Sequence, residues 1–302
     1  MRALTWGDIP PAARAALVSL AGGSGFEPIS RGYRGSVLGV LNERLFVKAA
    51  PASDPGLDDL ETEARVAAAL THLLSTPALR FDDAIDGWFV LGFDLARGQM
   101  PQEPWQPAQL QGVLDSLDAV ADTLTPSPVA ALPTIADRMR GRTTTWRLLR
   151  SGEARESLTP NDLSAWERRN LDRLADLEAR AEVSLTGQTL LHFDLRHDNL
   201  LIDDQAVTFL DWGRACIGPA WVDVACLLLE SRTVVADLNG IFRGTARGAA
   251  ADPSDVDVLL TIFASYWRHA ATLPSEARPG LRARRQYSAQ ATLGWLANRW
   301  SS

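Results

Sequence analysis

The chain lacks the features that mark disulfide-stabilised, exported and membrane-spanning proteins. It contains two cysteines, Cys216 and Cys226, which are ten residues apart and have neither CxxC nor CxxH spacing. We therefore expect two small buried apolar side chains, and neither a metal site nor a disulfide. No stretch approaches the roughly 18 uninterrupted apolar residues of a transmembrane helix, and the N-terminus has no apolar signal-peptide segment. These absences predict a cytoplasmic protein with no membrane partner.

Basic residues are in deficit. The chain has 30 Lys and Arg against 37 Asp and Glu, which gives a formal net charge of −7 at pH 7. An acidic surface does not attract nucleic acid, so we expect no nucleic-acid partner. It suits a cationic substrate, but solubility explains it as well. With 302 residues, 46% of them apolar, the chain can form one large domain or two lobes with a full hydrophobic core.

The first third of the chain has the pattern of a small sheet with one helix. Residues 36–41 and 44–49 are short apolar runs around a polar turn, which predicts two paired strands. Residues 57–74 place their apolar side chains on one helical stripe, and residues 88–93 are a further strand candidate. Residues 96–104 have the composition of a linker.

Helical periodicity dominates the rest of the chain. Apolar spacing predicts helices over residues 110–124, 163–177, 255–272 and 281–300. The second of these has a start signal, with Thr159 as N-cap, Pro160 at the first helical position and Asp162 as a capping-box acid. We therefore predict an α+β fold, with a strand-rich N-lobe over residues 1–95 and a mainly helical C-lobe over residues 96–302.

A non-helical island over residues 190–209 interrupts these helices, and it begins the most informative stretch of the chain. Asp194 and Asn199 are five residues apart on a predicted loop, and Asp211 follows a short apolar strand. Phosphoryl transfer requires a carboxylate that orients the substrate hydroxyl and hard oxygen ligands that hold Mg²⁺ against the phosphates. Either half of the pattern alone fits a polar turn or a strand-capping Asp equally well. The two halves together indicate a phosphotransferase.

These residues resemble the aminoglycoside phosphotransferase and choline kinase family of the protein-kinase-like superfamily. That family has a His-Gly-Asp-x-x-x-x-Asn catalytic loop followed by an Asp-Phe/Trp metal loop, and this chain has His192, Asp194, Asn199 and Asp211 at the matching positions. The resemblance implies a bilobal kinase-like fold with an antiparallel-sheet N-lobe. It also implies that Asp194 is the catalytic base, that Asn199 and Asp211 bind Mg²⁺, and that His192 supports the loop.

Two further positions bear on the catalytic loop. Phe193 stands where the family usually has Gly, so the backbone or the room for substrate beside the base differs here. Asp223 matches the family's second Asp, which braces the catalytic loop by hydrogen bonding. As a bare observation, Asp223 is equally well explained as an acid in the first turn of a helix.

The N-lobe is expected to supply the phosphate-binding residues. Lys48 lies on a predicted strand, where an interior lysine is costly to bury without an anionic partner. By resemblance it is the kinase lysine that pairs with the α- and β-phosphates, and otherwise it is a solubility lysine on an edge strand. Glu63 shares the apolar stripe of the following helix and is our predicted ion-pair partner for Lys48, with Glu61 as the alternative.

The remaining nucleotide contacts are expected from backbone groups. Gly32, Gly35 and Ser36 lie in a glycine-bearing loop that suits a phosphate cover through its N–H groups, although an ordinary turn before a hairpin explains it equally. The segment near Gly92 and Phe93 joins the lobes and is expected to offer backbone groups to the base of ATP or GTP.

The motifs predict a hydroxyl acceptor but do not name it. The sequence resembles antibiotic-modifying phosphotransferases of actinomycetes, which favours a resistance or self-protection kinase. A metabolic kinase for a small alcohol, sugar or amino alcohol is the alternative, and a nucleotide-binding pseudokinase is an alternative of another class. The predicted last helix carries four arginines and no acid, which argues against a broad aminoglycoside kinase: Arg282, Arg284, Arg285 and Arg299.

Overall fold

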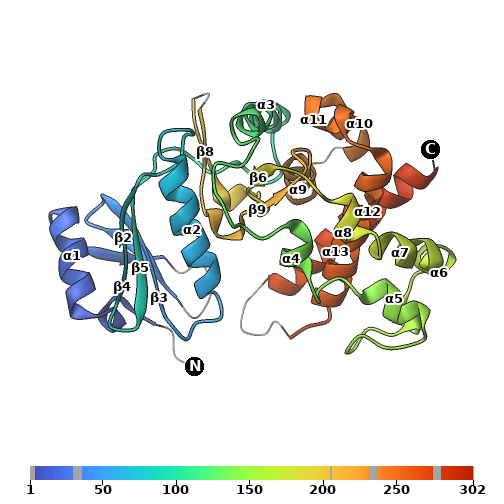
Figure 1. Ribbon diagram of the computed structural model, residues 1–302, viewed down its shortest axis with the longest axis horizontal. Helices are drawn as coiled ribbons and strands as arrows, with labels where there is room; N and C mark the ends of the chain where they lie inside the picture. Colours follow the sequence, from blue (N-terminus) through green and yellow to red (C-terminus); the bar gives the residue numbers. More distant parts are fainter. Residues whose placement is uncertain (1–3, 30–35, 205, 232–236, 275–279, 302) are drawn as a thin grey trace. The chain divides into compact units, whose positions relative to one another are not determined.

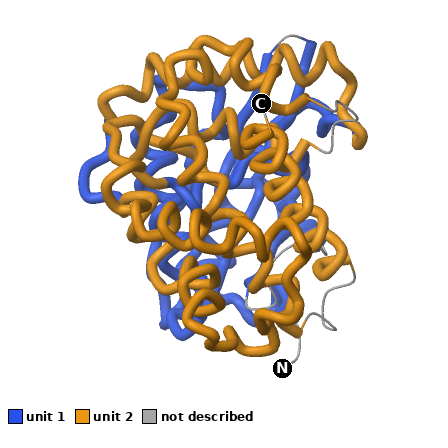
Figure 2. The backbone as a smooth tube through the Cα atoms, turned by 90° about the vertical axis from the view of Figure 1, so that its right-hand side faces the viewer, with its two compact units in different colours: residues 1–102, 128–132, 194–215 blue, residues 103–127, 133–193, 216–302 orange. Residues whose placement is uncertain are grey.

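Figure 1 shows the computed structural model, which describes residues 4–29, 36–204, 206–231, 237–274 and 280–301. The chain divides into two compact units, coloured separately in Figure 2. Unit 1 contains residues 1–102, 128–132 and 194–215, and unit 2 contains residues 103–127, 133–193 and 216–302. The units differ from the predicted lobes chiefly in residues 194–215, which belong to the same unit as the sheet.

The sheet of unit 1 has five antiparallel strands in the order β1-β2-β3-β5-β4. Its central hairpin follows from the sequence, because Asn42 and Glu43 adopt positive φ angles of 52° and 54° and turn the chain between two apolar strands. The strands of this sheet are β1 (Phe26–Pro28), β2 (Val37–Leu41), β3 (Leu45–Pro51), β4 (Leu79–Ile85) and β5 (Trp88–Asp94).

One helix packs on each face of this sheet, as Figure 1 shows. Helix α1 (Pro11–Ala21) buries Leu17 against one face, together with Val47 of β3. Helix α2 (Leu57–Leu70) buries Ala64 and Ala67 against the other face, with Leu91 of β5. Because side chains alternate along a strand, Lys48, which follows Val47 in β3, points to the α2 face.

Two differences from the predicted elements occur in this unit. Helix α2 ends at Leu70 rather than at residue 74, and the Thr71 hydroxyl donates to the Ala67 carbonyl at its end. The sequence did not lead us to expect α1 or β4, whose residues 79–85 include several polar side chains.

Residues 194–215 complete unit 1 with a short hairpin between two 3₁₀ turns. The elements are η3 (His197–Asn199), β7 (Leu200–Asp203), β8 (Ala206–Phe209) and η4 (Trp212–Arg214). Gln99 and Ile202 exchange backbone hydrogen bonds of 2.9 and 2.8 Å, so this hairpin is tied to the chain that follows β5.

Unit 2 is mainly helical, as predicted. Its one described strand pair is β6 (Thr189–Leu191) with β9 (Cys216–Gly218). Both cysteines are buried, as expected. Its helices and one 3₁₀ turn are α3 (Pro107–Thr123), α4 (Ile135–Met139), α5 (Thr145–Arg150), η2 (Pro160–Asp162), α6 (Ala165–Arg169), α7 (Leu171–Glu178), α8 (Ala181–Ser184), α9 (Val222–Glu230), α10 (Leu238–Gly244), α11 (Ala246–Ala250), α12 (Pro253–Ala270) and α13 (Leu281–Ser301).

The predicted helix over residues 163–177 is divided into separate pieces. The capping box of Thr159 and Asp162 is present, but it caps only the 3₁₀ turn η2. A second capping box, formed by Ser164 and Glu167, begins α6. The helices predicted at residues 255–272 and 281–300 are present as α12 and α13. Among the residues that the structure describes, no helix is both long enough and apolar enough to cross a membrane.

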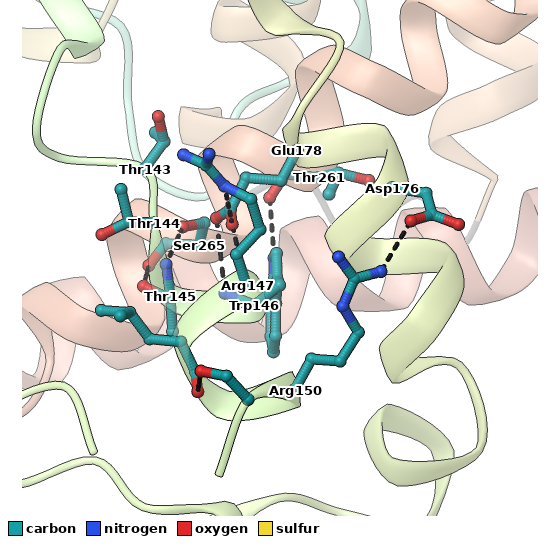
Figure 3. Close-up of polar contacts among 12 residues, drawn as sticks. Thr143, Thr144, Thr145, Trp146, Arg147, Arg150, Asp176, Glu178, Thr261 and Ser265 are labelled. Carbon is teal, nitrogen blue, oxygen red and sulfur yellow. Dashed lines mark hydrogen bonds and ion pairs between the residues drawn. The ribbon is translucent and has the colours of Figure 1, made fainter. Parts of the chain in front are cut away.

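A buried polar network joins α5 to α7 and α12 (Figure 3). The Glu178 carboxylate accepts the backbone N–H groups of Trp146 and Arg147 at 3.4 and 3.0 Å, so it caps the first turn of α5. The indole of Trp146 donates to the Thr261 carbonyl at 3.0 Å, and the Thr145 hydroxyl donates to the Ser265 carbonyl at 2.8 Å. These bonds satisfy polar groups that burial would otherwise leave unpaired.

Candidate active site

Lys48 is buried on the α2 face of the sheet and has two carboxylate partners. Its Nζ atom lies 2.8 Å from both carboxylate oxygens of Glu63 on α2, and 3.0 Å from Oδ1 of Asp211. The predicted ion pair of Lys48 with Glu63 is therefore present, whereas the alternative partner, Glu61, is exposed. A lysine that is only 8% exposed needs such partners to remain charged.

Burial and charge act in opposite directions on this pair. Burial lowers the pKa of Lys48, but Asp211 and Glu63 together outweigh it, so that pKa lies above its ordinary value. Burial and, to a lesser extent, the charge of Asp211 raise the pKa of Glu63 to about 7, against the opposing effect of Lys48. Lys48 thus carries one positive charge against two nearby carboxylates.

Asp194 and Asn199 meet within the same unit as Lys48. Nδ2 of Asn199 donates to the Asp194 backbone carbonyl at 2.8 Å and to its Oδ2 at 3.2 Å. Because the amide nitrogen is used in this way, the amide oxygen of Asn199 is the atom that remains to bind a metal. The Asp194 side chain is about one third exposed, so its carboxylate is accessible to a substrate hydroxyl.

Asp211 is held in an unusual backbone conformation beside this loop. Its φ angle is 63°, a left-handed conformation that aspartate tolerates better than most residues. The N–H of Leu210 donates to the Asn199 carbonyl at 2.9 Å, which ties the metal loop to the catalytic loop. The Asp211 side chain is 47% exposed and is available to a ligand as well as to Lys48.

The side chains of Asn199 and Asp211 suit Mg²⁺ that is also bound by water and phosphate. They do not suit a metal bound by protein side chains alone. Among the described residues, no group of three or more His, Cys, Asp or Glu side chains could hold a metal ion. Mg²⁺ is usually bound by one or two carboxylates together with water and substrate phosphates. One carboxylate from Asp211 and one amide oxygen from Asn199 fit that pattern.

The structure gives less information on the residues predicted to contact the nucleotide through their backbone. Gly32 and Gly35 lie outside the described residues, and Ser36 immediately precedes β2. Gly92 and Phe93 lie inside β5 and pair with residues of both β3 and β4, so the sheet uses their backbone groups. Gly92 has a packing reason, because a Cβ atom there would lie 3.0 Å from Leu17 of α1.

In unit 2, Asp223 binds the chain that leads into the catalytic loop. Its carboxylate accepts the backbone N–H of His192 at 2.7 Å and that of Phe193 at 2.9 Å. Asp223 also lies in the first turn of α9, so both interpretations of this residue describe the structure. Burial raises the pKa of Asp223, while His192 and the two N–H donors favour the carboxylate.

We predict that Asp223→Ala mainly lowers stability. The substitution leaves two backbone N–H groups without an acceptor, at a cost of about 2–4 kcal/mol in the free energy of unfolding. Asp223→Asn retains one acceptor oxygen, so its free energy of unfolding should lie between those of Asp223→Ala and the wild type. Denaturant unfolding of the three proteins measures the order, and equal stability of all three would contradict the bracing role.

Phe193 has a conformation that explains why the family usually has Gly at this position. Its φ angle is 63°, which costs a non-glycine residue about 1–2 kcal/mol. The ring packs against Phe263 of α12, with centroids 5.8 Å apart. The two hydrogen bonds to Asp223 and this ring contact hold the backbone in place despite the strain.

This strain predicts an inverted order of stability at position 193. Phe193→Gly should be more stable than Phe193→Ala by about 1 kcal/mol, because both lose the ring contact and only glycine adopts this φ without strain. At Glu61, an exposed position inside α2, the order of the same two substitutions should reverse, with Ala more stable by about 1 kcal/mol. Thermal unfolding of the four variants measures their stabilities. A more stable Ala variant than Gly variant at both positions would contradict the strained conformation.

Two arginines that the sequence analysis did not single out lie within or directly after the two sequence motifs of the site. Nε of Arg196 lies 3.1 Å from Asp198 and 3.6 Å from Asp194, inside the catalytic loop. Arg214, which directly follows the metal loop, lies 3.2 Å from Asp59 of α2. The position of each within or beside a motif was a usable signal for its importance, but the partner of Arg214 is 155 residues away in the chain.

Comparisons with known proteins identify a family and similar folds. A model of the phosphotransferase enzyme family matches residues 25–259. The fold is similar to the GDP and kanamycin complex of APH(2")-IIia, with 17% identity, a TM-score of 0.61 and coverage of 92% of this chain and 93% of that chain. It is also similar to choline kinase LicA from Streptococcus pneumoniae, with 12% identity, a TM-score of 0.60 and coverage of 95% and 98%.

A third similar structure is a thermostable mutant of aminoglycoside phosphotransferase APH(4)-Ia with ADP and hygromycin B. It has 12% identity, a TM-score of 0.58 and coverage of 94% of this chain and 98% of that chain. No curated protein sequence matches the chain. At these identities the similar structures establish the kinase-like fold.

Proposed function

Because the chain belongs to the phosphotransferase enzyme family, we propose that it transfers the γ-phosphoryl group of ATP or GTP to a hydroxyl group of a small molecule. The observation that carries this proposal is the grouping of Lys48, Glu63, Asp194, Asn199 and Asp211 within one compact unit. Phosphoryl transfer is catalysed mainly by positioning and charge stabilisation, and this grouping supplies groups for both.

Each residue then has a role that its contacts support. Lys48, oriented by Glu63, pairs with the phosphates. Asn199 and Asp211 hold Mg²⁺, which when bound neutralises charge on the phosphates. Asp194 orients the acceptor hydroxyl and accepts its proton. In the structure Lys48 contacts Asp211 at 3.0 Å, so nucleotide binding exchanges this contact for contacts with phosphate and metal.

For the acceptor, we propose an antibiotic-like hydroxyl compound and a resistance or self-protection role. Support comes from the similar structures with kanamycin and hygromycin B, while the similarity to a choline kinase favours the alternative of a small amino alcohol. Two of the four arginines of α13, Arg284 and Arg299, no longer argue against a cationic acceptor. Arg284 pairs with Glu230 at 3.1 Å and Arg299 pairs with Asp257 at 2.7 Å, so internal carboxylates neutralise both.

A nucleotide-consumption assay tests the proposal. Purified protein with Mg²⁺ and either ATP or GTP is incubated with aminoglycosides, with peptide and nucleoside antibiotics, and with small amino alcohols. One acceptor class should stimulate release of nucleoside diphosphate far above the acceptor-free rate. Tight nucleotide binding without stimulation by any acceptor would favour the pseudokinase alternative.

A further inference from the structure

Helix α2 has a second contact with the metal loop, one turn away from Glu63. Nη1 of Arg214 lies 3.2 Å from Oδ2 of Asp59, and both side chains are half-buried, at 26% and 30% exposed. The backbones also approach closely, because a Cβ atom at Gly213 would lie 2.9 Å from the Asp59 carbonyl oxygen. The loop that carries Asp211 is therefore packed directly on the first turn of α2.

The charges on α2 explain what the contact between Arg214 and Asp59 contributes. Asp59 and Glu63 are four residues apart on the helix and lie on the same face, where like charges repel. Each is neutralised by a cation from another element, Glu63 by Lys48 of β3 and Asp59 by Arg214 of η4. Arg214 offsets the charge of Asp59, which otherwise adds to the negative charge around Glu63.

We infer that the Arg214–Asp59 ion pair positions α2 for nucleotide binding by fixing Glu63, and through it Lys48, relative to the metal loop. The inference rests on the proposed function for the identity of the ligand, but the anchoring of α2 does not depend on it. When Asp211 turns from Lys48 to Mg²⁺, one of the contacts that join the metal loop to the lysine is lost. The Arg214–Asp59 pair remains to hold that loop against the helix.

The two partners are expected to differ in their effects. Arg214→Gln removes the anchor and leaves the Asp59 charge facing Glu63, so it should weaken binding of a magnesium-loaded nucleotide by about fivefold or more. Asp59→Asn removes the anchor and the repulsion together, so its effect should be smaller. In the Asp59→Asn background the Arg214–Asp59 pair is already broken, so adding Arg214→Gln should cost less affinity there than it does in the wild type.

Two measurements on the full-length protein test this inference. Calorimetric titration with Mg²⁺ and the non-hydrolysable imido analogues of ATP and GTP measures nucleotide affinity in the four proteins of the cycle. Hydrogen–deuterium exchange of α2 amides, without nucleotide, measures the anchoring and should be fastest in Arg214→Gln. Arg150→Gln is the matched control, since it breaks the 2.6 Å ion pair with Asp176 in unit 2 (Figure 3) and should change neither quantity.

The outcomes separate this inference from the proposed function. A double variant whose loss of affinity is clearly smaller than the product of the two single losses, with faster α2 exchange in Arg214→Gln, supports the positioning role. Unchanged α2 exchange in Arg214→Gln overturns it, and so does a double variant whose loss of affinity is the product of the two single losses. A wild-type protein that binds neither analogue refutes the proposed function, and the exchange measurement then still decides whether the pair anchors α2.

Discussion

Asp194→Asn is expected to lower turnover by about 10²–10⁴-fold, which is the usual contribution of a positioned general base. Asparagine keeps the shape of the side chain but cannot accept the proton of the acceptor hydroxyl. The hydrogen bond from Asn199 to the Asp194 backbone carbonyl does not depend on the carboxylate, so the fold of the loop should persist. Affinity for the nucleotide should change little, because the base acts in the transition state.

The neighbouring Asp198 offers a matched control for this variant. It lies in the same loop and pairs with Arg196 at 3.1 Å. Asp198→Asn removes an equal charge from the loop but no base, so it should retain most of the activity. Steady-state kinetics with the acceptor found in the assay above measures both variants. Near wild-type turnover of Asp194→Asn, or equal losses in both variants, would contradict the assignment of Asp194.

Asp211→Ala is expected to abolish the magnesium-dependent part of nucleotide affinity. Loss of an outer-shell partner commonly weakens a metal site by about 10- to 100-fold, and loss of a direct ligand should exceed this. Affinity without Mg²⁺ should be unchanged or slightly tighter, because the substitution removes a negative charge near the phosphates. It also removes one of the two carboxylate partners of Lys48, which in the structure lies 3.0 Å from Asp211.

Calorimetric titration of nucleotide with and without Mg²⁺ measures this difference directly. The wild type should bind more tightly with Mg²⁺, and the Asp211 variant should bind equally in both conditions. A variant that retains the full effect of Mg²⁺ would exclude Asp211 as a metal ligand. The Asp203→Ala variant is a suitable control, because this exposed residue of β7 lies in the same hairpin segment and has no proposed role.

The ion pair of Lys48 with Glu63 was predictable because it depends on two local periodicities. The alternation of β3 sends Lys48 to the face opposite Val47, and the apolar stripe of α2 turns Glu63 to the same core. Choosing Glu63 over Glu61 required only the helical period. The pairing of Arg214 with Asp59 was not predictable in this way, because both side chains are partly exposed and no periodicity relates them.

Other parts of the fold were missed where a local signal was weak or was misjudged. Helix α1 had start and stop signals, with Pro11 at its first position and Gly22 after its end in a left-handed conformation. The sequence analysis did not use them. In the segment after residue 159, the capping box was recognised, but a second one at Ser164 shows that the first signals a single turn.

At position 193, too, the sequence predicted only part of what the structure shows. The substitution of Phe for the usual Gly at position 193 was visible in the sequence, and it indicated an altered backbone or an altered substrate space. Only the structure shows that the backbone keeps a left-handed conformation and that the ring packs on Phe263. The packing partner could not be foreseen, because it lies on a helix 70 residues further along the chain.

Phosphorus NMR of a complete reaction tests the proposed transfer most directly. Protein, Mg²⁺ and either ATP or GTP are combined with the panel of hydroxyl compounds, and the fate of the γ-phosphate is followed. We predict a new phosphomonoester signal that grows as the γ-phosphate signal of the nucleotide declines, and that is absent when the metal is chelated. An unchanged nucleotide, or release of inorganic phosphate without a phosphomonoester for every compound, would contradict transfer to a small-molecule hydroxyl.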